Sequence, residues 1–213
     1  MTTIDTILFD MDGVLIDARD WHYEALNKAL SVFGMAISRL DHLNNFDGLP
    51  TREKLKLLTI ERNFPEQLHS FVNELKQRYT MQMVYQYCHP SFQHEYALSR
   101  LKSSSVKLGL CSNSVRRSVE LMTERANLDR YFDVILSNED VTNSKPDPEI
   151  FKTAMLKLNT QPERTLIVED NENGIKAAVA SGAHVMRVLS PDDVTFANID
   201  QHLRQLAETQ SGQ

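Results

Sequence analysis

The sequence has 213 residues, enough for one large domain or for a domain that carries an insertion. Hydrophobic residues make up 41% and charged residues 24%, which is typical of a soluble globular protein. The formal net charge of -6 argues against a nucleic-acid backbone as a partner. We find no run of about 18 apolar residues and no secretory signal at the N-terminus, so we expect no membrane partner.

The two cysteines, Cys88 and Cys111, do not have the spacing of a zinc site. Cys111 lies in an apolar run and is expected to be a small buried hydrophobic residue. A reducing cytoplasm is therefore the expected location.

The first predicted element is a buried strand that begins the stretch Ile7–Val14. It leads into two aspartates, Asp10 and Asp12, followed by Gly13. The carboxyl ends of strands in open α/β sheets are where ligands bind. Two carboxylates there can hold a hard cation while one attacks an electrophile. The alternative is a surface turn, because Asp and Gly both favour turns.

Residues 17–94 have a different pattern, with few glycines and apolar residues at helical spacing. The first predicted helix contains Trp21 and Phe33 and ends near Gly34. Further helices are predicted over Arg52–Leu58 and Gln67–Tyr87. We expect this block to form a small helical domain.

From residue 95 onward, predicted strands alternate with predicted helices. The strands cover Val106–Cys111, Phe132–Leu136, Thr165–Val168 and His184–Val188. The helices cover Val115–Ala126, Pro148–Leu158 and Gly174–Ser181. This alternation predicts right-handed crossovers and a parallel sheet, and hence an α/β fold.

Polar side chains follow four of the predicted strands at the point where each strand ends. They are Asp10 and Asp12, then Ser112 and Asn113, then Lys145 in a loop, and finally Glu169 and Asp170. Parallel strands bring their carboxyl ends to one edge of the sheet, so we expect a common site there. Several carboxylates repel one another unless a cation lies among them, and oxygen ligands favour Mg²⁺.

Each of these residues also has a purely structural explanation. Ser112 is a suitable helix cap, and Asp147 could cap the helix that begins with Pro148. Lys145 could be an exposed loop residue, and the acidic pair after the fourth strand could complement a helix dipole. Their coincidence at successive strand ends favours a shared site.

The segments DMDGVLID, LCSNS, SKPDPEIF and VEDNENGIKAA resemble the four signature motifs of the haloacid dehalogenase superfamily, in the same order. The helical block resembles the small cap of the β-phosphoglucomutase-like branch. The resemblance implies a Rossmann-like parallel-sheet core made of residues 1–16 and 95–213. It also implies an inserted helical cap made of residues 17–94.

By this resemblance, Asp10 is the nucleophile that forms an aspartyl-phosphate. Asp12 is the general acid that protonates the leaving group and then the base that activates water. The dehalogenases of the superfamily lack the second aspartate, because halide needs no proton. The presence of Asp12 therefore favours phosphoryl transfer.

The resemblance also implies Mg²⁺ as the cofactor, held by Asp10, Asp170 and the backbone carbonyl of Asp12. Glu169 is implied as a metal ligand that acts either directly or through water. The remaining residues act on the phosphoryl group: Ser112 and Asn113 bind its oxygens, and Lys145 neutralises charge.

Two residues of the cap are candidate substrate ligands. His22 matches a histidine of β-phosphoglucomutase-like proteins, although it could be a surface histidine. Arg52 matches an arginine that holds a second phosphate in the mutase, although it could be a solvated residue. Pro50 lengthens the spacing before that arginine, and Ala18 replaces a threonine of the mutase hinge. Both departures weaken a mutase assignment.

The resulting hypothesis is a Mg²⁺-dependent phosphatase for a small phosphate monoester, such as a sugar phosphate. A phosphomutase is the alternative, and a non-catalytic protein that binds a phosphorylated metabolite is a more distant one. In each case the partner is a small phosphorylated metabolite. The oligomeric state is left open, and a monomer is compatible with the composition.

Overall fold

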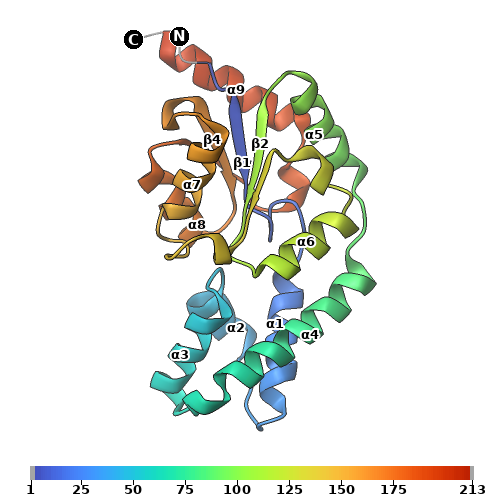
Figure 1. Ribbon diagram of the computed structural model, residues 1–213, viewed down its shortest axis with the longest axis vertical. Helices are drawn as coiled ribbons and strands as arrows, with labels where there is room; N and C mark the ends of the chain where they lie inside the picture. The colour runs from blue at the N-terminus through green and yellow to red at the C-terminus, as the bar shows by residue number, and fades with distance from the viewer. Residues whose placement is uncertain (1–2, 212–213) are drawn as a thin grey trace.

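A computed structural model of the chain describes residues 3–211. Its centre is a five-stranded parallel sheet with the strand order β3-β2-β1-β4-β5 (Figure 1). The strands are β1 (Thr6–Phe9), β2 (Lys107–Cys111), β3 (Val134–Leu136), β4 (Thr165–Glu169) and β5 (His184–Arg187). Each predicted strand is present, and the predicted Rossmann-like α/β fold is confirmed.

Helices cover both faces of the sheet, so its central strands are buried on both sides. Figure 1 shows α7 and α8 on one side of the sheet and α5 and α6 on the other. The sheet-covering helices are α5 (Phe92–Ser103), α6 (Arg116–Arg125), α7 (Glu149–Leu158), α8 (Glu172–Ser181) and α9 (Phe196–Ser211). The 3-10 turns are Asp129–Tyr131, Asn138–Asp140, Pro162–Arg164 and Pro191–Asp193.

The alternation of side chains along β1 divides the core between the two faces. Ile7 and Phe9 belong to an apolar cluster that includes residues of α5, α6 and α9. Leu8 belongs to a second cluster with residues of α7 and α8. All four residues of β1 are buried, which explains why the strand reads as an uninterrupted apolar run.

The register of the sheet sets the level at which the polar strand ends meet. Phe9 of β1 pairs with Leu110 of β2 and with Val168 of β4. The next residue along each strand is therefore Asp10, Cys111 or Glu169, all at the same level. The central strand thus carries its aspartate between two neighbours at the carboxyl edge.

The remaining helices gather at one end of the molecule, beyond the carboxyl ends of the strands (Figure 1). They are α1 (Arg19–Ser31), α2 (Arg39–Asp41), a π-helix (His42–Phe46), α3 (Thr51–Arg62), a 3-10 turn (Glu66–Leu68) and α4 (His69–Tyr87). They enclose an apolar cluster of their own, which includes Leu30, Phe46 and Leu58. We call residues 17–94 the cap; its boundaries remain a prediction, and α5 runs through residues 94–95.

Four helices within residues 3–211 have no counterpart among the predicted elements: the short α2, the π-helix that follows it, and the longer helices α5 and α9. The stretch that forms α5 exposes aromatic residues such as Phe92, which obscures its buried stripe of Ala97, Leu98 and Leu101. In α9, apolar side chains recur from Phe196 to Leu206 and pack against the sheet cluster. Helical spacing was therefore present in α9 and could have revealed it.

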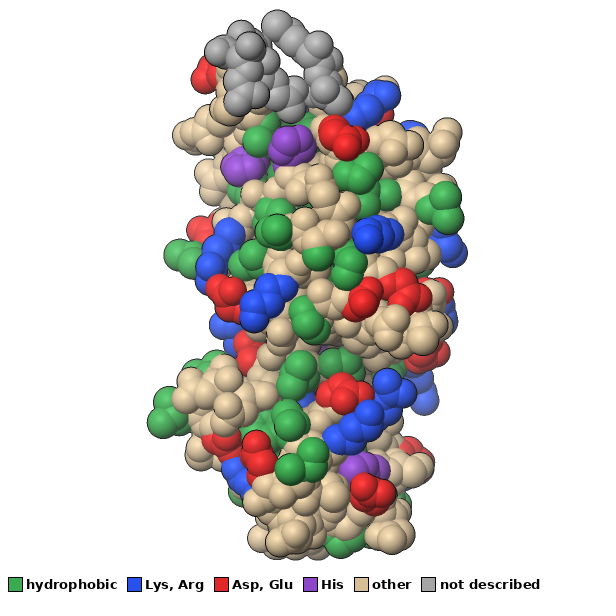
Figure 2. Space-filling view, turned by 90° about the vertical axis from the view of Figure 1, so that its left-hand side faces the viewer, with side chains coloured by type: hydrophobic (Ala, Val, Ile, Leu, Met, Phe, Trp, Pro, Cys, Tyr) green, Lys and Arg blue, Asp and Glu red, His purple; other side chains and the backbone are tan. Residues whose placement is uncertain are grey.

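The face of the molecule in Figure 2 carries basic and acidic side chains interspersed with small hydrophobic areas. This mixture agrees with the modest net charge. None of the helices in residues 3–211 combines the length and the apolar character needed to cross a bilayer.

Helix α7 offers a matched test of the packing. Phe151 is fully buried, whereas Leu156 on the same helix is 81% exposed. Phe151→Ala is expected to lower the free energy of unfolding by about 3–5 kcal/mol, because it leaves a cavity against the sheet. Leu156→Ala is expected to change it by less than about 0.5 kcal/mol. Chemical denaturation measures both values, and equal losses would contradict the described packing.

Candidate active site

A buried lysine joins two strands at the carboxyl edge of the sheet. The Lys145 Nζ donates to Asp10 Oδ1 at 2.6 Å, to Glu169 Oε1 at 2.6 Å and to the Cys111 carbonyl at 2.8 Å. Burial alone would lower the pKa of Lys145, but the two carboxylates outweigh it and raise the pKa. The lysine is therefore a fixed positive charge beneath Asp10.

Three carboxylates form an acidic cluster around this point. Oxygen atoms of Asp10, Glu169 and Asp170 lie within 4.8 Å of one another. Burial raises the pKa of Asp10 well above its ordinary value; Lys145 opposes this, and Glu169 adds to it. Burial and Glu169 raise the pKa of Asp170 to about 6, although Arg19 opposes them. Burial and mutual repulsion thus disfavour the ionised forms of Asp10 and Asp170, which a bound cation would stabilise.

The donor set fits a divalent oxygen-binding cation such as Mg²⁺. Asp170 Oδ1 is buried and has no hydrogen-bond partner among the described residues, which a cation would satisfy. Glu169 is already engaged on both oxygens, since Oε1 accepts from Lys145 and Oε2 accepts from the backbone amides of Asp170 and Asn171. Asp10 and Asp170 are therefore the freer ligands of the three.

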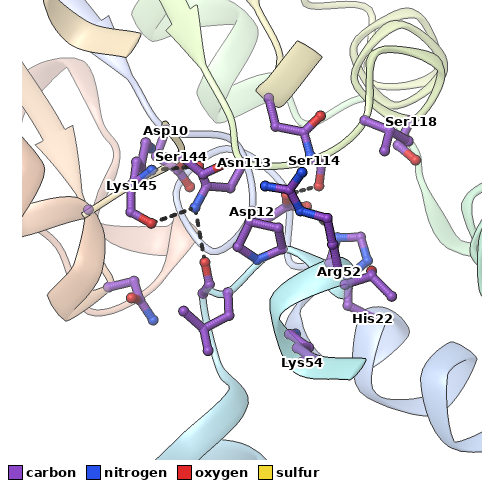
Figure 3. A pocket seen from close by; sticks show the side chains of 18 of the residues that line it. Asp10, Asp12, His22, Arg52, Lys54, Asn113, Ser114, Ser118, Ser144 and Lys145 are labelled. Atoms are coloured by element: carbon purple, nitrogen blue, oxygen red, sulfur yellow. Dashed lines mark hydrogen bonds and ion pairs between the residues drawn. The ribbon is translucent and has the colours of Figure 1, made fainter. Parts of the chain in front are cut away.

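The carboxylate of Asp12 faces the cap (Figure 3). Its Oδ1 lies 3.0 Å from His22 Nε2, and its Oδ2 accepts from Ser114 Oγ at 2.9 Å. Lys76 Nζ lies 3.0 Å from His22 Nδ1. This geometry suits a neutral imidazole that accepts from Lys76 and donates to Asp12.

The pKa shifts of His22 and Asp12 agree with a neutral imidazole at this position. Burial and Lys76 lower the pKa of His22, and Asp12 opposes them. Burial raises the pKa of Asp12, but His22, Ser114 and Lys76 outweigh it, so the net shift is downward. Asp12 is therefore a carboxylate supported by a neutral histidine at neutral pH.

The two polar residues after β2 are both engaged within the protein. Ser112 is fully buried; its Oγ accepts from the Ser114 amide at 3.0 Å and lies 3.4 Å from Asp12 Oδ2. Asn113 Nδ2 donates to the carbonyl oxygens of Gly48 at 3.1 Å and Lys145 at 3.3 Å. Asn113 therefore links the core to the cap.

The structure brings the predicted site residues together around a pocket of about 340 Å³ between the core and the cap. Those that line it are Asp10, Asp12, His22, Arg52, Asn113, Lys145, Glu169 and Asp170. Ser112 lies beneath the lining. Arg52 is at the rim, because its side chain is 75% exposed and its Nε donates to Glu53 Oε1 at 3.2 Å.

Several lining residues were missed by the sequence analysis: Arg19, Asp47, Lys54, Lys76, Ser114 and Asn171. Ser114 belongs to the quoted LCSNS segment and could have been included. Asn171 belongs to the quoted VEDNENGIKAA segment of the core and could likewise have been included. Arg19, Asp47, Lys54 and Lys76 reach the pocket through the packing of the cap, which no spacing along the chain reveals.

One of the missed residues connects the acidic cluster to the cap. Arg19 donates to Asp170 Oδ2 at 2.5 Å and lies 3.5 Å from Asp47 Oδ2. Asn171 Nδ2 donates to the same Asp47 oxygen at 3.1 Å. The loop between the π-helix and α3 is thus held to the core beside the acidic cluster.

Glycine is required at two positions where the backbone passes close to the acidic cluster. Gly13 has φ 92°, and a Cβ there would lie 2.2 Å from Asp170 Oδ2. A Cβ on Gly174 would lie 1.8 Å from Glu169 Oε1. The side chains of Asp170 and Glu169 therefore lie directly against the backbone.

Comparisons with known proteins agree on one family. A family model described as haloacid dehalogenase-like hydrolase matches residues 7–188. The phosphorylated carbohydrates phosphatase of Thermotoga maritima is 31% identical over 182 residues, covering 84% of this chain and 82% of that protein. Pyrophosphatase PpaX of Oceanobacillus iheyensis is 29% identical and covers 81% of this chain and 78% of its own.

The fold also matches a solved structure. The β-phosphoglucomutase of Clostridium difficile has a TM-score of 0.81 and 24% identity, covering 95% of this chain and 98% of that chain. This similarity concerns the fold.

Substitution of Gly174 tests the close packing beneath Glu169. Gly174→Ala is expected to displace the Glu169 side chain. This displacement would break its contacts with Lys145 and with two backbone amides. We expect a loss of about 1–3 kcal/mol in the free energy of unfolding. Thermal and chemical denaturation measure the effect, with Ala180→Gly on the exposed side of the same helix as a control for helix propensity. Unchanged stability of the alanine variant would contradict this arrangement.

Proposed function

The chain belongs to the haloacid dehalogenase-like hydrolases, and from this membership and the site geometry we propose a Mg²⁺-dependent phosphatase. Its substrate would be a small phosphate monoester, such as a sugar phosphate. The observation that carries the proposal is the pair of aspartates after β1. Asp10 is anchored to Lys145 in the acidic cluster, and Asp12 faces the cap against His22.

In the first step, a carboxylate oxygen of Asp10 would attack phosphorus while the bond to the leaving oxygen breaks. Lys145 binds one oxygen of Asp10 and supplies positive charge where two anions approach. The phosphoryl group is then attached to Asp10 as an acyl phosphate. In the second step water attacks this phosphorus, releasing phosphate and the free carboxylate.

Asp12 would first have to take up a proton; it would give this proton to the leaving alkoxide and then take one from the attacking water. Its orientation is set by Ser114 on one oxygen and His22 on the other. Lys76 in turn fixes the tautomer and orientation of His22. A cap residue therefore positions the acid-base group, although it does not itself touch the reacting atoms.

When bound, Mg²⁺ would neutralise negative charge on the phosphoryl oxygens. Asp10, Asp170 and the backbone carbonyl of Asp12 would hold it directly. Glu169 would act through water, because both of its oxygens are already engaged.

Ser112 and Asn113 would bind the phosphoryl oxygens, and Ser112 must first be uncovered, because it lies beneath the pocket lining. The Asn113 amide already donates to the carbonyls of Gly48 and Lys145, and one of these bonds must be released before it can donate to a phosphoryl oxygen. Release of the Gly48 bond would alter a contact between the core and the cap.

The relatives support a phosphorylated small molecule as the substrate, because the Thermotoga maritima protein is named a phosphatase of phosphorylated carbohydrates. We further propose a reducing, cytoplasmic location, which the two buried free cysteines suit. Phosphate release from a panel of sugar phosphates and other monoesters tests the function. Slow release with rapid isomer formation in the presence of a bisphosphate primer would instead indicate a mutase, and binding without turnover would indicate a binding protein.

The role of Asp12 predicts a dependence on the leaving group. Asp12→Asn is expected to lower kcat/KM for alkyl phosphates by about two to four orders of magnitude. The loss on 4-nitrophenyl phosphate should be much smaller, because its leaving group needs little protonation. Equal losses on both substrates, in a folded variant, would show that Asp12 only shapes the site.

Metal removal is a second test. EDTA is expected to abolish turnover, and Mg²⁺ should restore it. Ca²⁺ should substitute poorly, because it is larger and accepts both oxygens of a carboxylate, including the attacking one of Asp10. Asp170→Ala should raise the Mg²⁺ concentration needed for half-maximal rate. Full activity in excess chelator would rule out the metal.

The position of Arg52 at the rim predicts a contact with a distant anionic group of the substrate. Arg52→Ala should lower kcat/KM for such a substrate by about one to two orders of magnitude, and less for 4-nitrophenyl phosphate. Arg78→Ala, an exposed residue of the cap, is the control. No loss on either substrate would leave Arg52 as a solvated residue.

A further inference from the structure

Two lysines of the cap are buried and line the pocket. Lys54 on α3 and Lys76 on α4 are each only 7% exposed. Lys76 contacts the His22 ring. Lys54 forms no hydrogen bond and no ion pair within residues 3–209, which leaves its ammonium group without a direct partner. A buried charge without a partner is costly, so an unpaired one beside a pocket points to a ligand.

The acidic groups nearest to Lys54 are already occupied by other partners. Asp47 and Asp12 are the carboxylates that act on Lys54 electrostatically. Asp47 is bound by Arg19 and Asn171, and Asp12 is bound by His22 and Ser114. Within residues 3–209, neither carboxylate makes a direct contact with Lys54.

Lys54 also acts electrostatically on basic neighbours. Burial lowers the pKa of Lys54 to about 8, while Asp47 and Asp12 oppose the shift. Burial and Lys54 lower the pKa of Lys76 to about 7. The positive charge of Lys54 also contributes to lowering the pKa of His22 and of His42. Burial is the largest cause of both lysine shifts, so a bound anion would stabilise their charged forms.

The location of Lys54 shows which part of a substrate it would meet. Figure 3 places Lys54 on the cap side of the pocket, across from Asp10 and Lys145. The phosphoryl group would lie at Asp10, and the leaving oxygen would lie at Asp12. Lys54 is therefore on the side of the leaving group.

We propose that Lys54, assisted by Lys76, binds an anionic substituent of the leaving group, either a carboxylate or a second phosphate. The proposal rests on the proposed phosphatase function and narrows its substrates to those with a negatively charged leaving group. It also assigns Lys54 as a specificity-determining residue. A substrate with a neutral leaving group would leave the Lys54 ammonium unpaired and would therefore bind more weakly.

Substrate pairs that differ in charge but hardly in size provide the test. One pair is phosphoglycolate and 2-hydroxyethyl phosphate, and a longer pair is 3-phosphoglycerate and glycerol 3-phosphate. The wild type should prefer the acidic member of at least one pair by about tenfold to a hundredfold in kcat/KM. Lys54→Gln should remove most of that preference, and Lys54→Arg should retain part of it.

Lys56→Gln is the matched control, because Lys56 lies on the same helix but is exposed and pairs with Glu53. It should leave the preference unchanged. A wild type without preference in either pair, or a Lys54→Gln variant that loses the same factor on both members, would overturn the proposal.

Thermal shifts separate this proposal from the proposed function, because they need no turnover. Phosphoglycolate should raise the Tm of the wild type more than 2-hydroxyethyl phosphate does, and Lys54→Gln should abolish the difference. Lys54→Met should not lower the Tm of the free protein, because it removes an unpaired buried charge. A clear fall in that Tm would show an internal partner for Lys54 and contradict the proposal. Absence of hydrolysis by the wild type, with these shifts present, would refute the phosphatase function alone.

Discussion

The ion triad of Lys145 with Asp10 and Glu169 is the interaction on which the rest of the site depends. The two carboxylates belong to the neighbouring strands β1 and β4, and both lie at the buried carboxyl edge of the sheet. Without the ammonium between them, they would be like charges in a poorly solvated place, which strongly disfavours ionisation. The strand order therefore places the two carboxylates close together, and Lys145 in the loop before α7 supplies a positive charge that partly offsets their repulsion.

The cap and the acidic cluster form one electrostatic unit. Arg19 binds Asp170 of the cluster and Asp47 of the cap loop, and Asn171 binds the same loop from the core. From the other side, the cap brings His22 to Asp12. An opening of the cap would break the contacts of Arg19 with Asp170 and of His22 with Asp12, so access to the pocket is coupled to the surroundings of these two carboxylates.

The core could be predicted from the sequence because its signals are local. Asp10 and Glu169 lie at strand ends, Lys145 lies in the loop that follows β3, and parallel strands must place those ends on one edge. The residues of the cap that line the pocket could not be predicted in this way. Lys54 and Lys76 meet in the pocket only through the packing of helices, and the spacing along the chain does not encode how those helices cross. Their burial was equally hidden, because a lysine in an amphipathic helix is expected to face solvent. His22 could be predicted because it matches a histidine of β-phosphoglucomutase-like proteins. The spacing along the chain alone does not indicate it.

Covalent catalysis by Asp10 is the central step of the proposed phosphatase mechanism. The decisive measurement is mass spectrometry of protein quenched in acid during turnover of a phosphate monoester, followed by peptide mapping. We predict a phosphoryl group on the peptide that contains Asp10, absent in Asp10→Asn and lost on longer incubation as phosphate is released. Turnover without any phosphorylated protein, or a phosphoryl group on another residue, would contradict the account.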